Sequence, residues 1–154
     1  MSIVEFLYTA RASPGARSSA SGWVSTSGGK VTDQNILWEN CAEQDTFLEA
    51  MADAASTVAK HFAGKIAYVA VMKNLSVDCD CCAVAEDPCM NDVGILSSLD
   101  PVALDRACID LVINSNDPGR DHFMERVNSR HGTHTIDSAE ALGIGTQAYE
   151  LVKV

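Results

Sequence analysis

Four of the six cysteines in this 154-residue sequence lie within eleven residues, and they are the side chains with the clearest potential for chemistry. They are Cys79, Cys81, Cys82 and Cys89, spaced C-x-C-C-x6-C. The surrounding stretch, residues 74–95, also contains five carboxylates and no lysine or arginine. Thiols beside so much negative charge resist deprotonation, because each like charge raises the pKa of the next group. A soft metal ion reverses this balance, since it binds thiolates and favours their deprotonated form.

We therefore expect these four cysteines to bind a metal ion or an iron–sulfur cluster. Four sulfurs suffice for a tetrahedral zinc site or for a cluster, although the spacing is typical of neither. The side chains of Cys81 and Cys82 diverge in an extended segment, so a site in which three cysteines meet one ion is also open. Around such a site, Asp78 and Asp80 would accept hydrogen bonds or add oxygen ligands. There are two alternatives to metal binding. The first is a set of reduced thiols in an acidic surface loop, and the second is a thiol–disulfide pair.

Other candidates have ordinary structural explanations beside the functional ones. Cys108 falls on the apolar face of a predicted helix, which is typical of a small core residue, whereas Cys41 lies among polar residues. His131 and His134, in the sequence RHGTHT, are candidate imidazole ligands, but a polar turn explains them better. Residues 120–130 contain three arginines. They could hold an anion, pair with the acidic loop, or form the solvated face of a helix.

Charge and hydropathy exclude several classes of function. Eleven basic and twenty-one acidic residues give a net charge of −10, so long-range repulsion argues against nucleic acid or an anionic membrane as a partner. No apolar run reaches the roughly 18 residues that cross a bilayer. The first residues lack the basic segment of a signal peptide. These features predict a cytoplasmic protein, in which thiols stay reduced.

The chain has the length of one domain, residues 1–154, that buries its own core. Residues 1–35 are poorly predicted, because they are rich in Ser and Gly and show little apolar periodicity. A structureless stretch of this length is unusual early in a compact domain, which favours a fragment of a longer protein.

The remaining pattern predicts an α/β fold with a small, at least partly parallel or mixed sheet flanked by helices. Helices are predicted at residues 45–62, 101–114, 120–129 and 137–142, and strands at residues 65–73, 93–97 and 146–154. Thr46 and Glu49 could form a capping box, Gly64 could end the first helix, and Asp100-Pro101 is typical of a helix start. Residues 65–73 are nearly all apolar and predict a buried strand. The cysteine loop follows this strand, where open sheets hold their sites.

Two elements of the sequence resemble a known family. DCDC at residues 78–81 and DPVALD at residues 100–105 are similar to the C-terminal part of the family called domain of unknown function 362. The similarity is close over residues 74–112 and looser over residues 38–154. Members are described as uncharacterised iron–sulfur-containing proteins, so the resemblance implies a cluster. It carries over only to Cys79 and Cys81, and the chain lacks the run C-x2-C-x2-C-x3-C of ferredoxin-type clusters.

Together these observations predict a domain whose cysteine loop binds a metal or an iron–sulfur cluster, with a redox or electron-transfer role. Cys79 and Cys81 are the expected ligands, completed by Cys82 and Cys89. The expected partner is a redox protein or a missing N-terminal domain, with no nucleic acid and no membrane. The alternative is a non-enzymatic domain with a structural zinc or a loop of free thiols. A third interpretation is a thiol enzyme with one low-pKa cysteine. The sequence assigns no substrate or reaction.

Overall fold

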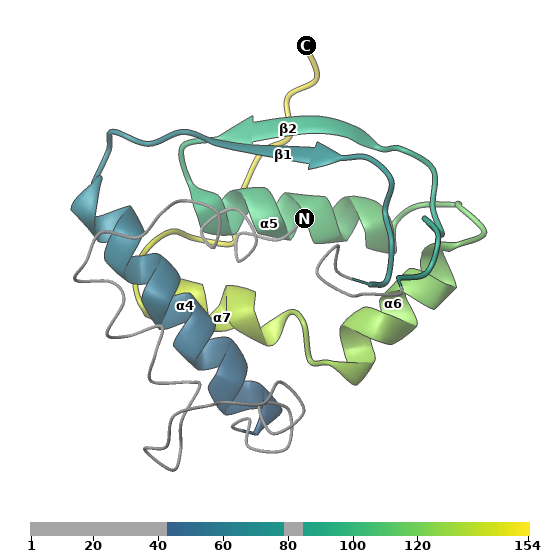
Figure 1. Ribbon diagram of the computed structural model, residues 1–154. Helices are drawn as coiled ribbons and strands as arrows, with labels where there is room; N and C mark the ends of the chain where they lie inside the picture. The colour runs from purple at the N-terminus through teal and green to yellow at the C-terminus, as the bar shows by residue number, and fades with distance from the viewer. Residues whose placement is uncertain (1–42, 79–84) are drawn as a thin grey trace.

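The computed structural model describes residues 43–78 and 85–154 of the protein. Within them the chain forms four helices and two strands, in a mixed α/β arrangement. The elements are, in order, α4 (Gln44–His61), β1 (Tyr68–Met72), β2 (Gly94–Ser98), α5 (Pro101–Ile113), α6 (Arg120–Ser129) and α7 (His134–Ala141). Figure 1 shows the sheet lying on α5, with α4 and α7 on the other side of that helix.

The two strands described are antiparallel, with Val71 opposite Ile95 and Tyr68 opposite Ser98. The predicted α/β class is confirmed, whereas no parallel pair occurs among the described residues. The physical reason is the connection: residues 73–78 and 85–93, the described part of the chain between β1 and β2, contain no crossover helix of the kind that parallel neighbours need. The loop predicted to follow a strand end therefore connects two antiparallel neighbours.

The buried strand predicted at residues 65–73 is confirmed as β1, but only one of its faces is buried. Tyr68, Ala70 and Met72 are buried, while Val69 and Val71 between them are about half exposed, at 49% and 50%. Such alternation is expected of a strand in an antiparallel sheet that packs a single face against the core. Here α5 packs against that face.

α5 begins as the sequence predicts. The side chain of Asp100 caps the helix by accepting hydrogen bonds from the amides of Val102 (2.9 Å) and Ala103 (3.0 Å), and Pro101 occupies the first turn. These bonds satisfy amides that have no partner inside the helix. Val102 is fully buried, so the cap also fixes the end of the helix that enters the core.

α4 also lies where its periodicity predicts, but its cap differs. The helix begins after Glu43, and no side chain caps its N-terminus, so the predicted capping box of Thr46 and Glu49 is wrong. Gly64, with φ of +71°, follows the helix end as expected. The buried face of α4 packs against α7, which begins at His134, three residues earlier than predicted.

Three clusters of buried side chains form the core. One joins α4, α5 and α7 through Ala52, Val102, Ile136 and Ala139. A second joins β1, α5 and the ends of the cysteine loop through Met72, Leu75, Met90 and Val112. A third, around Leu104, fixes β1 to α5. The core therefore reaches the loop and holds both of its ends.

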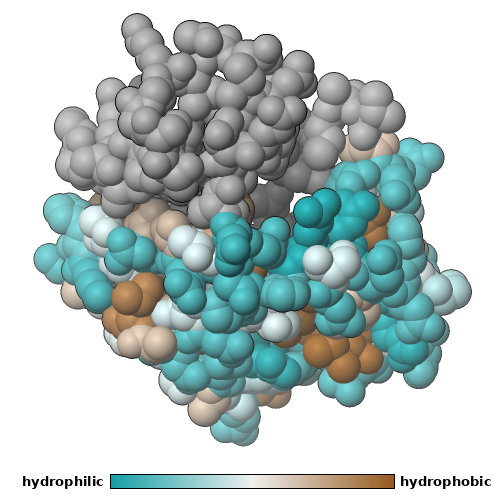
Figure 2. All heavy atoms as spheres, turned by 90° about the horizontal axis from the view of Figure 1, so that it is seen from below, coloured by the Kyte–Doolittle hydropathy of each residue, from teal (hydrophilic) through white to brown (hydrophobic). Residues whose placement is uncertain are grey.

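Two further expectations concern the outside of the molecule. Residues 146–154 form no regular element, so the predicted last strand is wrong. No helix in the described part of the chain has the length and apolar character needed to cross a membrane. Where Figure 2 shows described residues, the face opposite the sheet is mainly hydrophilic, with separate hydrophobic areas.

Candidate functional site

The structure describes the two ends of the cysteine loop, residues 75–78 and 85–90, which we call the loop base. Cys79, Cys81, Cys82 and Asp80 lie outside the described residues, as does Cys41. The loop base begins with a bridge between Leu75 and Met90. The amide of Cys89 donates to the carbonyl oxygen of Leu75 at 2.8 Å, so both ends are fixed to the sheet side of the core.

Hydrogen bonds between side chains and backbone close the loop base further out. The amide of Glu86 donates to Oδ2 of Asp78 at 3.0 Å, and the hydroxyl of Ser76 donates to the carbonyl oxygen of Glu86 at the same distance. The Ser76 hydroxyl in turn accepts from the amide of Asp78. Residues 78 and 86 are therefore held side by side. The segment with three of the four loop cysteines starts and ends at this fixed pair.

Helix α6 holds the loop base from outside. Arg126 donates from Nη1 to Oδ1 of Asp78 at 2.8 Å and to the carbonyl oxygen of Val77 at 3.3 Å. His122, one turn earlier, contacts Oε2 of Glu86 through Nε2 at 2.9 Å. Pairing of residues 120–130 with the acidic loop is thus confirmed for Arg126 and His122, whereas Arg120 pairs with the adjacent Asp121. We call Arg126 and His122 with these partners the α6 clamp.

Asp78 stays ionised to lower pH than an ordinary carboxyl. The hydrogen bond from the Glu86 amide and then that from Arg126 lower the pKa of Asp78. Since the folded-state pKa is below the unfolded one, this carboxylate stabilises the fold at neutral pH, and the contribution is lost as the pH falls through the folded pKa. We therefore expect the hydrogen bonds of Asp78 in the loop base to weaken only in acid.

Replacing Arg126 by alanine should open the loop base locally. The substitution removes the only cation that contacts Asp78 among the described residues, so we expect faster hydrogen exchange at the amides of Asp78 and Glu86. The rest of the protein, including α5, should exchange as before. Arg130→Ala is the matched control, because Arg130 is the C-cap of the same helix, is exposed, and its side chain forms no hydrogen bond or ion pair with the described residues.

Acid gives an independent check on the same contact. In the unmodified protein, exchange at the Glu86 amide should rise as the pH is lowered through the folded pKa of Asp78, after correction for intrinsic rates. In Arg126→Ala this rise should begin at higher pH, because Asp78 then lacks the cation that lowers its pKa. Equal exchange in Arg126→Ala and Arg130→Ala would show that Arg126 does not hold the loop base.

Cys89 is the one proposed ligand that the structure describes. Its Sγ donates to the carbonyl oxygen of Leu75 at 3.5 Å, and its side chain packs against the cluster around Met90 and Val112. Burial raises the pKa of the Cys89 thiol, and the charges of Asp117 and Glu86 act in the same direction. The thiol is therefore protonated at neutral pH unless a cation favours its thiolate.

Cys108 behaves as the core residue that the sequence predicts. It packs against two of the core clusters and lines an apolar cavity of about 280 Å³ between the helices. Burial raises the pKa of Cys108 to about 11, and the nearby charge of Asp105 adds to this. A thiol so strongly protonated is a poor nucleophile and a poor metal ligand.

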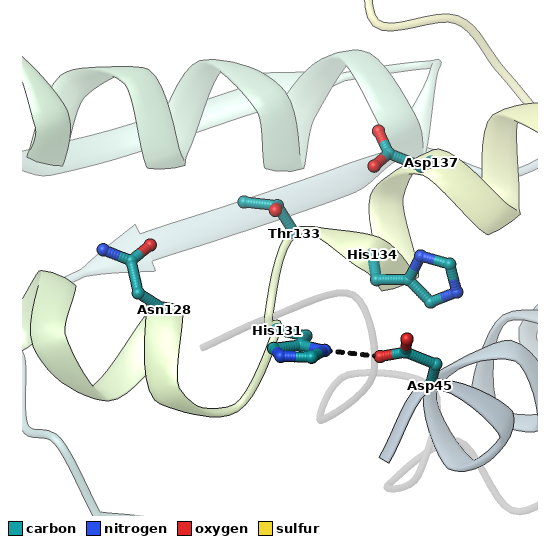
Figure 3. A pocket seen from close by; sticks show the side chains of 6 residues that line it. All are labelled: Asp45, Asn128, His131, Thr133, His134 and Asp137. Atoms are coloured by element: carbon teal, nitrogen blue, oxygen red, sulfur yellow. Dashed lines mark hydrogen bonds and ion pairs between the residues drawn. The ribbon is translucent and has the colours of Figure 1, made fainter. Parts of the chain in front are cut away.

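His131 and His134 line a surface depression of about 350 Å³ between the α6–α7 turn and the start of α4. Nδ1 of His131 contacts Oδ1 of Asp45 at 2.7 Å, and Nε2 of His134 contacts Oε1 of Glu49 at 3.1 Å. In Figure 3 His131 faces Asp45, while Asp137 points away from both. Each histidine thus joins a carboxylate of α4, in keeping with a polar turn that connects two elements.

The described residues do not by themselves form a metal site. Among residues 43–78 and 85–154, no group of three or more His, Cys, Asp and Glu side chains could hold a metal ion. His131 and His134 therefore do not converge with their carboxylates on a common point. Any soft-metal site at the loop would need sulfurs from residues 79–82 in addition to Cys89.

A family model described as "Domain of unknown function (DUF362)" matches residues 13–110. The match includes the whole cysteine loop and most of α5, and leaves α6 and α7 outside it. No curated protein and no solved structure matches the chain.

Proposed function

Because the chain belongs to the family described as "Domain of unknown function (DUF362)", a description that assigns no activity, we propose a function from the chemistry of the loop itself. In this proposal, residues 79–89 bind a metal ion or an iron–sulfur cluster. Cys79 and Cys81 are ligands, and Cys82 and Cys89 complete the set. Bound there, a cluster would supply one-electron transfer, and the domain would serve a redox protein or a further domain as an electron carrier.

The observation that carries this proposal is the closure of the loop base. Asp78 and Glu86 are held together by a hydrogen bond of 3.0 Å, and the α6 clamp fixes each of them. A ligand set on a loop with free ends loses much conformational entropy when it binds a metal. A loop whose ends are already joined loses less, so a fixed base favours binding by the cysteines between its ends.

The electrostatics of the loop base support a cation in particular. Burial raises the pKa of Cys89, and the negative charges of Asp117 and Glu86 raise it further. A bound metal cation would lower that pKa and compensate the carboxylates at once. The Cys89 thiol would then give up its hydrogen bond to the Leu75 carbonyl, and the Cys89 amide would keep its own.

A structural zinc is the second candidate, because the same loop closure would also suit an ion whose only role is to join residues 79–82 to Cys89. Zinc accepts four thiolates in tetrahedral geometry and has no redox chemistry. The two candidates share their ligands and differ in colour and in sulfide content.

Metal analysis of the protein purified without oxygen tests the proposal. We expect about one equivalent of zinc, or iron together with acid-labile sulfide and a visible absorption band. The double variant Cys79→Ser/Cys81→Ser should lose at least ~90% of the bound metal while α-helical circular dichroism stays unchanged. Cys108→Ala is the matched control, because it removes a thiol from the helix core and should keep the metal.

The three results have distinct meanings. Iron with sulfide, lost in the double variant, supports a cluster and an electron-transfer role. Zinc without sulfide supports the structural alternative and removes the redox role. A folded protein without either metal, or equal metal content in the double variant, would show that the loop is not a metal site.

A further inference from the structure

The core holds helix α6 less firmly than it holds the other three described helices. α6 has no buried residue, whereas α4, α5 and α7 each have several. Phe123 and Met124, in its first half, pack on the core cluster beside the loop base. Val127, in its second half, lines the apolar cavity that Leu48 and Met51 of α4 also line. α4 and α6 do not pack against each other, so direct packing between these two helices does not fix the second half of α6.

The chain turns after α6 at a histidine whose backbone conformation favours glycine. His131 has φ of +51°, and its amide and the next one donate to the carbonyl oxygens of Asn128 and Val127 at 3.1 and 2.8 Å. Many helices end in this way, usually with glycine at the left-handed position. Gly64 after α4 and Gly143 after α7 follow that rule, each with φ of +71°. A Cβ atom strains this conformation, so the backbone alone gives no reason for a histidine after α6.

The side chain of His131 gives such a reason, because it joins the end of α6 to α4. Its Nδ1 donates to Oδ1 of Asp45 at 2.7 Å, and Asp45 lies in the first turn of α4, 86 residues earlier in the chain. Figure 3 shows the His131 ring directed toward this carboxylate. A little more than one turn before His131, the same helix carries Arg126, which holds the loop base. Contacts at both ends thus hold α6, on one side to the loop base and on the other to α4.

We propose that His131 is a positioning residue, which fixes the C-terminal end of α6 to α4 through Asp45 and so keeps the α6 clamp on the loop base. A helix that is held at one end only can pivot about that end. A pivot of α6 would lengthen the contacts that Arg126 and His122 make with the loop base. The proposal concerns the clamp, so it does not depend on whether the cysteines bind a metal.

A second histidine–carboxylate contact in the same turn provides the matched control. Nε2 of His134 contacts Oε1 of Glu49 at 3.1 Å, so the residue type, the kind of contact and the helix contacted are the same. His134 begins α7, however, and α7 is fixed by Ile136 and Ala139 in the core cluster that includes α4. Loss of the His134 contact should therefore leave α6 in place.

Hydrogen exchange at the Glu86 amide tests the proposal. We expect exchange about two- to fivefold faster in His131→Gly and in Asp45→Ala, the range in which an exposed ion pair can shift a local opening equilibrium. Glycine also relieves the backbone strain at residue 131, so the melting temperature of His131→Gly should not fall. Faster exchange at Glu86 in that variant would then be local and not a sign of general destabilisation.

Two more variants test whether the two side chains act through each other. Asp45→Glu keeps a carboxylate acceptor and should exchange at Glu86 nearly like the unmodified protein. The double variant of His131→Gly with Asp45→Ala should exchange no faster than either single variant, because both remove the same contact. Single effects that multiply in the double variant would show two independent roles and would overturn the proposal.

Two other outcomes would also overturn it. One is unchanged exchange at Glu86 in both His131→Gly and Asp45→Ala. The other is an equal acceleration in His134→Ala, which would mean that any contact between this turn and α4 has the same effect. Metal content does not enter the measurement, so either outcome would leave the proposed function of the loop as it stands.

Discussion

Asp100→Ala is expected to lower the free energy of unfolding by about 2 to 3 kcal/mol. One oxygen of Asp100 accepts from the amides of Val102 and Ala103, and the other accepts from the amide of Thr146 at 2.9 Å. Alanine removes the cap of α5 and, at the same time, the contact that holds the segment after α7 to it. For a chain of this size the loss corresponds to a melting temperature lower by roughly 4 to 12 °C.

Two further variants separate the cap from the second contact. Asp100→Asn retains an oxygen for the helix amides but places an NH₂ group against the Thr146 amide, so it should lose less than Asp100→Ala. Asp53→Ala removes an exposed carboxylate in the middle of α4 that forms no hydrogen bond or ion pair with the described residues. It should change stability by less than about 0.5 kcal/mol. Denaturant unfolding of the three variants measures this order. A loss below about 0.5 kcal/mol for Asp100→Ala would mean that the cap does not stabilise the fold.

Elements with strong local signals were predictable from the sequence. α5 starts at the Asp100-Pro101 pair because a capping side chain and a residue with fixed φ act within one turn. α6 has the predicted bounds, since a proline and a glycine precede it in the sequence NDPG. In each case the deciding interaction lies within a few residues, so no knowledge of the fold is needed.

Elements that depend on a partner were not predictable in this way. The apolar run that contains β1 fits a strand buried on two faces, but its Val69 and Val71 lack a covering layer among the described residues. Residues 146–154 alternate like a strand and pair with no described strand. Pairing and burial are settled by which segments meet in space, and the local sequence contains no information on that.

The candidate site likewise has features that the sequence predicts and contacts that it does not. The thiols and their acidic surroundings were visible in the sequence, and so was the possibility that the arginine-rich segment pairs with them. Which residues of the two segments pair could not be predicted. Arg126 and Asp78 lie 48 residues apart in the chain, and His122 and Glu86 lie 36 residues apart. Opposite charges attract in many registers, and only the packing of α6 beside the loop base selects this one.

Gly119→Ala is expected to disrupt the loop base directly, at a cost of about 2 kcal/mol in the free energy of unfolding. Gly119 precedes α6, and a Cβ atom at this position would collide with the backbone carbonyl of Cys89. Its φ of −81° is allowed for any residue, so the effect is steric and not conformational. The Cys89 amide is bonded to Leu75 and the Asn91 amide to Asp117 at 3.0 Å, so the backbone of the loop cannot move away without breaking these bonds.

The local readout is hydrogen exchange at the amides of Cys89 and Asn91, which should become much faster than in the unmodified protein. Any metal bound by the loop should also dissociate more readily, because Cys89 would lose its position. Gly64→Ala is the matched control: Gly64 has φ of +71° with open space around it, so alanine there costs about 1 kcal/mol of backbone strain. Since Gly64 lies after α4, that loss should leave exchange at Cys89 and Asn91 unchanged. If the two glycine variants gave the same exchange at Cys89, the close approach of α6 to the loop base would not constrain the loop.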